Sequence, residues 1–140
     1  MKSIQLTVAA FAATLALAAT VSAQEAKAAV TLPPASTKTG VTYATDIKPI
    51  FDASCVKCHS GDRPKARLKM DSLEGVLKGT KEGKIVTVGD SANSMIVKSV
   101  AHLTHNPDGW MPPLNNRAGI KPLTDEQIGL VRAWIDQGAK

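Results

Sequence analysis

Two cysteines and a histidine stand close together in the chain, as Cys55-Val56-Lys57-Cys58-His59. If this segment is helical, both thiols lie on one side of the backbone with the imidazole beside them. The two thiols can then form thioethers with the two vinyl groups of one porphyrin, and the imidazole can bind its iron. C-x-x-C-H is the attachment pattern of a c-type haem, and the 140 residues contain just these 2 cysteines. The motif therefore predicts one covalent haem c, with His59 as an axial ligand.

Other uses of the C-x-x-C pair fit the surrounding sequence less well. A thioredoxin-like pair follows a strand of a βαβ unit, and no such alternation flanks Cys55. A zinc site could take Cys55, Cys58, His102 and His105, but two histidines separated by two residues are closer than usual. A simple disulfide would leave His59 without a role.

The second axial position needs a ligand from elsewhere in the chain. Met111 is the strongest candidate, because two prolines stiffen the backbone beside it in the WMPPL segment at 110–114. A thioether ligand raises the reduction potential of haem and keeps outside ligands away. His102 and His105 are rivals, since a second imidazole would give a bis-histidine haem of lower potential. We expect Met95 in the core and Met70 too near the motif to reach around the haem.

Helices are the elements expected to position these ligands, because apolar residues recur at helical spacing in several segments. This pattern predicts several separate helices along the chain. The first helix is expected to begin near Asp46 as its cap and to lead into the C-x-x-C-H motif. Further helices are expected at 72–78, at 92–101 with Ser91 as cap and Met95 inward, and at 124–138, with 84–88 extended.

The last of these helices is the best defined. Thr124 and Gln127 fit a capping box, and Gly138 fits a C-terminal stop. Gly129 in its interior has two interpretations: it permits a close crossing with the first helix, or it is tolerated on an exposed face.

The N-terminal residues indicate export. A single lysine precedes an uncharged, alanine-rich stretch that ends in Val21-Ser22-Ala23, which resembles a signal cleavage site. We expect residues 1–23 to be a signal peptide that directs the protein to the periplasm, with no membrane span after cleavage. The alternative is an uncleaved anchor, since the stretch is close to the length of a span. Residues 24–41 lack periodicity and are expected to be a flexible leader, which leaves 42–140 as one small domain.

The formal net charge of +5 suggests an acidic partner. Export argues against nucleic acid, so a redox partner protein with an acidic docking face is the better fit. Oligomeric state is not predicted. Five basic residues lie within the motif or shortly after it and would ring the haem edge or form a solvated loop: Lys57, Arg63, Lys65, Arg67 and Lys69.

These motifs together resemble the planctomycete-type cytochrome c domain, within the class I cytochromes c. The resemblance extends from Tyr43 to Gly138, and its most specific parts are the C-x-x-C-H motif and Met111-Pro112-Pro113. The family often has proline at positions 88 and 91 and glycine at 66, where this chain has other residues. The resemblance implies a small all-α cytochrome c fold over 42–140, with three to four helices around one covalently attached haem and with His59 and Met111 as axial ligands.

Two classes of function follow from the sixth ligand. With both axial positions filled, the protein would be a single-electron carrier or the cytochrome subunit of an exported oxidoreductase, and not an enzyme in itself. With a vacant or labile sixth position, it would be a haem peroxidase-like enzyme or a haem-based ligand sensor.

Overall fold

The computed structural model describes residues 31–140, so the predicted signal peptide and residues 24–30 lie outside it. Four α-helices and three short helical turns make up the fold, and no strand is present between residues 31 and 140. The all-α prediction is therefore confirmed. The elements in chain order are η1 (Tyr43–Ile47), α1 (Lys48–Ser54), η2 (Lys65–Arg67), α2 (Leu73–Lys78), α3 (Met95–Val100), η3 (Pro107–Gly109) and α4 (Asp125–Asp136).

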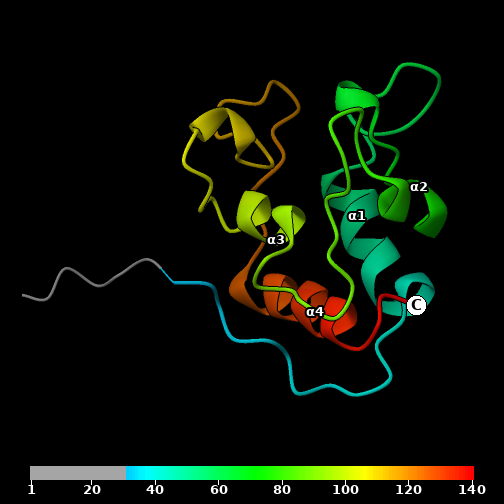
Figure 1. The fold of residues 1–140 in the computed structure, drawn as a ribbon. Helices are drawn as coiled ribbons and strands as arrows, with labels where there is room; N and C mark the ends of the chain where they lie inside the picture. The colour runs from blue at the N-terminus through cyan, green and yellow to red at the C-terminus, as the bar shows by residue number, and fades with distance from the viewer. Residues whose placement is uncertain (1–30) are drawn as a thin grey trace, which may run out of the picture.

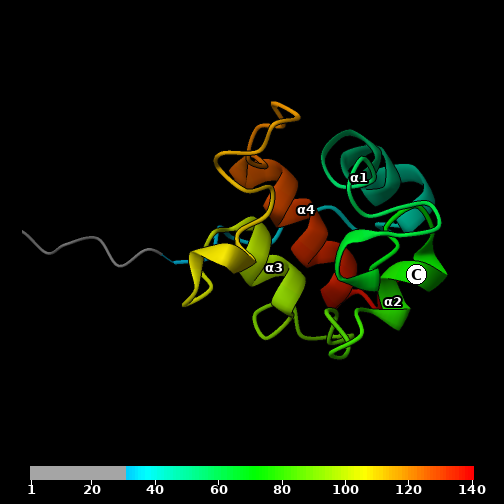
Figure 2. The same cartoon turned by 90° about the horizontal axis from the view of Figure 1, so that it is seen from above.

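Helix α4 is the central packing element. It contacts η1 and α3, and Figure 2 shows it between α1 and α3. Its apolar stripe is buried and consists of Ile128, Val131, Trp134 and Ile135. Trp134 packs against Tyr43 and Phe51 with ring centroids 6.0 and 6.4 Å apart. The predicted capping box is present, since Thr124 Oγ1 accepts from Gln127 N and Gln127 Oε1 accepts from Thr124 N. The helix therefore begins where its sequence predicts.

Two helices differ from their predicted starts. The first begins at η1 with Thr42 as its cap, and Asp46 accepts the Thr42 N–H from within the turn. Helix α3 begins three residues later than expected, with Ser94 as its N-cap residue, because residues 91–93 form a turn. Ser91 is instead buried, and its hydroxyl donates to Asp136 of α4 at 2.9 Å. The expected stretch at 84–88 contains no helix.

The described part of the predicted leader is not free of the domain. Residues 31–41, here called the strap, run past α4 (Figure 1). Ser36 N donates to the carbonyl oxygen of Gly129 at 2.9 Å, and Gln137 Nε2 donates to Lys38 O at 2.7 Å. Arg132 also donates to the carbonyl of Pro33. The strap carbonyls that accept from Arg132 and Gln137 are backbone groups, which leave no periodic pattern in the sequence, so this contact was not predicted.

Gly129 faces the strap and not the first helix. A Cβ atom at this position would lie 2.7 Å from the carbonyl oxygen of Pro34. The expectation of a close crossing was correct in kind but wrong in partner, because the approaching backbone is the strap.

No helix between residues 31 and 140 is long and apolar enough to cross a membrane.

Candidate cofactor site

One cavity of about 380 Å³ brings the predicted ligand residues together. The C-x-x-C-H motif and the loop after it form one wall, and α3 with the Met111 segment forms another. Most of the other side chains that line it are apolar, including Leu68, Ile85, Ile96, Val100 and Ile120. Such a lining suits a flat apolar macrocycle that must be kept from water.

The C-x-x-C-H motif forms a turn after α1 and is not part of the helix itself. Cys55 is the C-cap residue of α1, and its carbonyl accepts from Cys58 N at 3.1 Å and from His59 N at 3.0 Å. Residues 55–59 thus keep the hydrogen bonds of a single helical turn. Both thiols are free, and both line the cavity together with His59. The spacing argument holds because a single turn is enough to gather the three side chains.

The imidazole of His59 is held by the loop that follows the motif. The ring is buried, and its Nδ1 lies 3.1 Å from the carbonyl oxygen of Lys65. With the proton on Nδ1, this nitrogen donates to Lys65 and leaves Nε2 free to bind a metal. The backbone of the same loop closes on the motif, since Lys65 N donates to Cys58 O and Met70 N donates to His59 O.

Burial shifts the pKa values of two groups in the motif, the Cys55 thiol and the His59 imidazole. It raises the pKa of the Cys55 thiol to about 12, with a smaller contribution from Cys58, so this thiol is neutral at pH 7 before attachment. Burial also lowers the pKa of His59, although the hydrogen bond to the Lys65 carbonyl opposes the shift. His59 is therefore neutral at pH 7, and the neutral imidazole is the form that binds iron.

The Met111 segment lies against the C-terminal end of α3. Met111 is partly buried, lines the cavity, and donates its backbone N–H to the Ser99 carbonyl at 3.0 Å. Pro112 and Pro113 line the cavity beside it. The structure thus brings Met111 to the same cavity as Cys55 and His59.

The other two methionines between residues 31 and 140 also line this cavity. Met70 is buried, and its carbonyl accepts from the Tyr43 hydroxyl at 3.0 Å. Met95 is 52% exposed, so its predicted place in the core is wrong. Met95 is the first residue of α3 and follows directly on the turn at 91–93.

The two rival histidines do not line the cavity. The ring of His102 stacks on Trp110 with centroids 5.1 Å apart, and its Nε2 lies 3.2 Å from the Pro112 carbonyl oxygen. His105 is exposed. Over residues 31–140, no three His, Cys, Asp or Glu side chains gather as a metal site, so the zinc interpretation gains no support.

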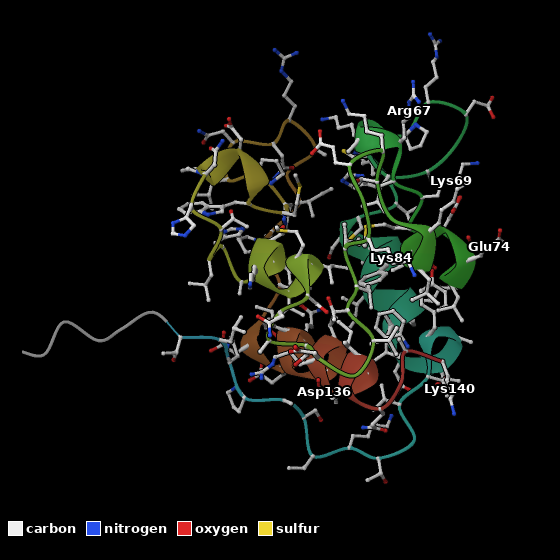
Figure 3. All side chains as sticks on the ribbon, viewed as in Figure 1. Arg67, Lys69, Glu74, Lys84, Asp136 and Lys140 are labelled. Atoms are coloured by element: carbon white, nitrogen blue, oxygen red, sulfur yellow. The ribbon has the colours of Figure 1, made fainter. Side chains whose placement is uncertain are left out.

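The five basic residues in the motif and shortly after it are all exposed. Three of them, Arg63, Arg67 and Lys69, line a shallow surface hollow. Figure 3 shows Arg67 and Lys69 at the end of the molecule opposite Asp136. None of the five takes part in the ion pairs found within residues 31–140. They are therefore available to an acidic surface.

The donor set fits a c-type haem. Two thiols and an imidazole from one turn, with a thioether from a distant segment, surround one largely apolar cavity. The contribution of Lys65 was not predicted, because it acts through its backbone carbonyl, a group that every residue has.

Residues 55–115 match the family model described as planctomycete cytochrome C. The matched segment begins at Cys55 and includes the whole C-x-x-C-H motif and Met111. No curated protein and no solved structure matches the chain.

Proposed function

Since residues 55–115 belong to the planctomycete cytochrome C family and carry one covalent haem c at Cys55 and Cys58, we propose that this protein carries single electrons in the periplasm. His59 and Met111 are its two axial ligands in this proposal. The observation that carries it is the shared cavity, which Met111 lines together with the C-x-x-C-H motif.

The residues of the cavity have separate tasks. When bound, the haem supplies a one-electron iron couple. Cys55 and Cys58 fix it covalently to the turn after α1, and the Lys65 carbonyl orients His59 so that Nε2 points away from that hydrogen bond. The Met111 sulfur would raise the reduction potential of the bound haem and would exclude outside ligands. With His59 and Met111 both bound to its iron, the protein would transfer electrons without binding a substrate there.

Location and partner follow from features outside the cavity. The predicted signal peptide supports a periplasmic protein, to which haem is attached after export. The exposed basic residues near the motif, including Arg63, Arg67 and Lys69, support docking to an acidic face of a redox partner. The partner is either a separate protein or the catalytic subunit of an exported oxidoreductase.

Substitution of Met111 tests the proposed ligation. In Met111→Ala, we expect the far-red absorption band of the ferric iron–sulfur bond to disappear and ferrous CO binding to become fast. In Met111→His, six ligands remain but the reduction potential falls, because imidazole stabilises ferric iron more than thioether does. Peroxidase activity should rise in the Ala variant.

Met95→Ala is the matched control, because this methionine lines the same cavity but is 52% exposed. We expect its holoprotein to keep the wild-type spectrum. A wild-type spectrum in Met111→Ala that is lost in Met95→Ala, His102→Ala or His105→Ala would reassign the sixth ligand. Rapid CO binding by the wild-type protein would instead favour the peroxidase-like enzyme or the ligand sensor.

A further inference from the structure

Helix α3 ends in a turn that ordinarily calls for glycine. Leu103 N donates to Lys98 O at 2.8 Å and His102 N donates to Ser99 O at 3.2 Å, which is the hydrogen-bond pattern of a Schellman motif. The residue in the left-handed position of this motif is His102, with φ of +56°. Glycine adopts this conformation without strain, whereas a side chain makes it costly. A histidine here is best explained by what its side chain contacts.

The side chain of His102 contacts the residues on both sides of Met111. Its ring lies parallel to Trp110, with an interplanar angle of 5° and centroids 5.1 Å apart. Its Nε2 lies 3.2 Å from the Pro112 carbonyl oxygen, and with a proton on Nε2 it donates there.

Met111 is also held through its own backbone. Its N–H donates to Ser99 O at 3.0 Å, and this carbonyl is the one that accepts from His102 N. Three consecutive residues are thus attached to the C-terminal end of α3 and the turn that follows it. Trp110 stacks on His102, the Met111 N–H donates to Ser99 O, and the Pro112 carbonyl accepts from His102. A short segment held at three successive points has little freedom to move its central sulfur.

We propose that His102 is a positioning residue that clamps the Met111 segment and keeps the Met111 sulfur on the iron. This inference rests on the proposed ligation by Met111, because the clamp has a functional consequence only if that sulfur is bound. His102 does not line the cavity, so it acts through Trp110 and Pro112 and not as a ligand. Loss of its side chain should raise the rate at which an outside ligand replaces Met111.

His102→Gly separates the side chain from the turn. Glycine is the preferred residue at this left-handed position, so the variant removes both side-chain contacts while it relieves the backbone. The probe is cyanide, which binds ferric haem only after the sixth ligand has left. We expect cyanide to bind the holoprotein about tenfold faster, the scale of losing one hydrogen bond and one aromatic contact. The far-UV melting temperature should not fall.

Three further variants complete the experiment. His105→Gly is the matched control, because His105 is exposed, and its cyanide binding should equal that of the wild type. Trp110→Leu removes the stacking partner and should also accelerate binding. The double variant His102→Gly/Trp110→Leu should be about as fast as the faster single variant, since both changes open one clamp. If His102→Gly yields no holoprotein, His102→Asn tolerates the same φ, lacks the ring and should bind cyanide faster as well.

The outcomes distinguish this inference from the proposed function. If Met111→Ala binds cyanide rapidly but His102→Gly stays within about twofold of the wild type, the clamp is refuted and the ligation stands. Rate increases that multiply in the double variant would also refute the clamp, because the two residues would then act independently. If Met111→Ala binds cyanide no faster than the wild type, the proposed ligation itself fails.

Discussion

Gly129→Ala should destabilise the protein, although alanine is the better helix former. In an exposed helix interior, this change would stabilise the fold by about 1 kcal/mol. At this position, the added Cβ would lie 2.7 Å from the Pro34 carbonyl oxygen and 3.4 Å from Ser36 N. The first contact is too short and involves backbone, so the strap has to move away from α4.

The size of the effect follows from what the strap loses. Displacement of the strap breaks the hydrogen bond from Ser36 N to Gly129 O and the one from Arg132 to the Pro33 carbonyl. The neutral bond contributes about 1 kcal/mol and the charged one about 2 kcal/mol, so the loss is about 3 kcal/mol. After the gain in helix propensity, the net fall in unfolding free energy is about 2 kcal/mol.

Denaturant unfolding of the holoprotein, followed by circular dichroism, measures this change. The matched background is a variant with residues 24–36 deleted, in which nothing lies over Gly129 and the same substitution should stabilise by about 1 kcal/mol. The sign of the effect should therefore reverse between the two backgrounds. Stabilisation by Gly129→Ala in both would refute the close approach of the strap to α4.

Two further changes test the core and the attachment site. Burial raises the pKa of Tyr43 to about 12. The folded state therefore favours the neutral phenol, and its stabilisation is complete below pH 10 and lost as pH rises towards 12. Tyr43→Phe should remove this loss, which is at most about 3 kcal/mol, from the pH dependence of unfolding. Cys58→Ala should leave one thioether at Cys55 and lower the holoprotein yield, as measured by intact mass and haem staining after denaturation. A normal yield with two covalent links would contradict the attachment assignment.

The sequence predicted the parts of the site that depend on local spacing. C-x-x-C-H gathers its side chains within one turn, so its chemistry is visible without the fold. The start of helix α4 was predicted for the same reason, since Thr124 and Gln127, which form its capping box, are only three positions apart in the sequence. Met111 stood out because the prolines beside it mark a rigid segment.

The missed features depend on contacts between distant segments. The Lys65 carbonyl at His59 and the strap carbonyls at α4 are backbone groups, which carry no signature of residue type. The role of His102 depends on a stack with Trp110 that forms only after α3 and the following loop are placed. Met95 was misplaced because its exposure depends on how α3 lies against the rest of the fold, which helical spacing alone does not show.

Carbon monoxide binding to the ferrous wild-type holoprotein tests the central claim most directly. If His59 and Met111 both bind iron, the spectrum should stay unchanged when CO is added at neutral pH, while Met111→Ala converts to the CO complex under the same conditions. An immediate conversion of the wild-type protein would show that the sixth position is open. That result would contradict a closed electron carrier.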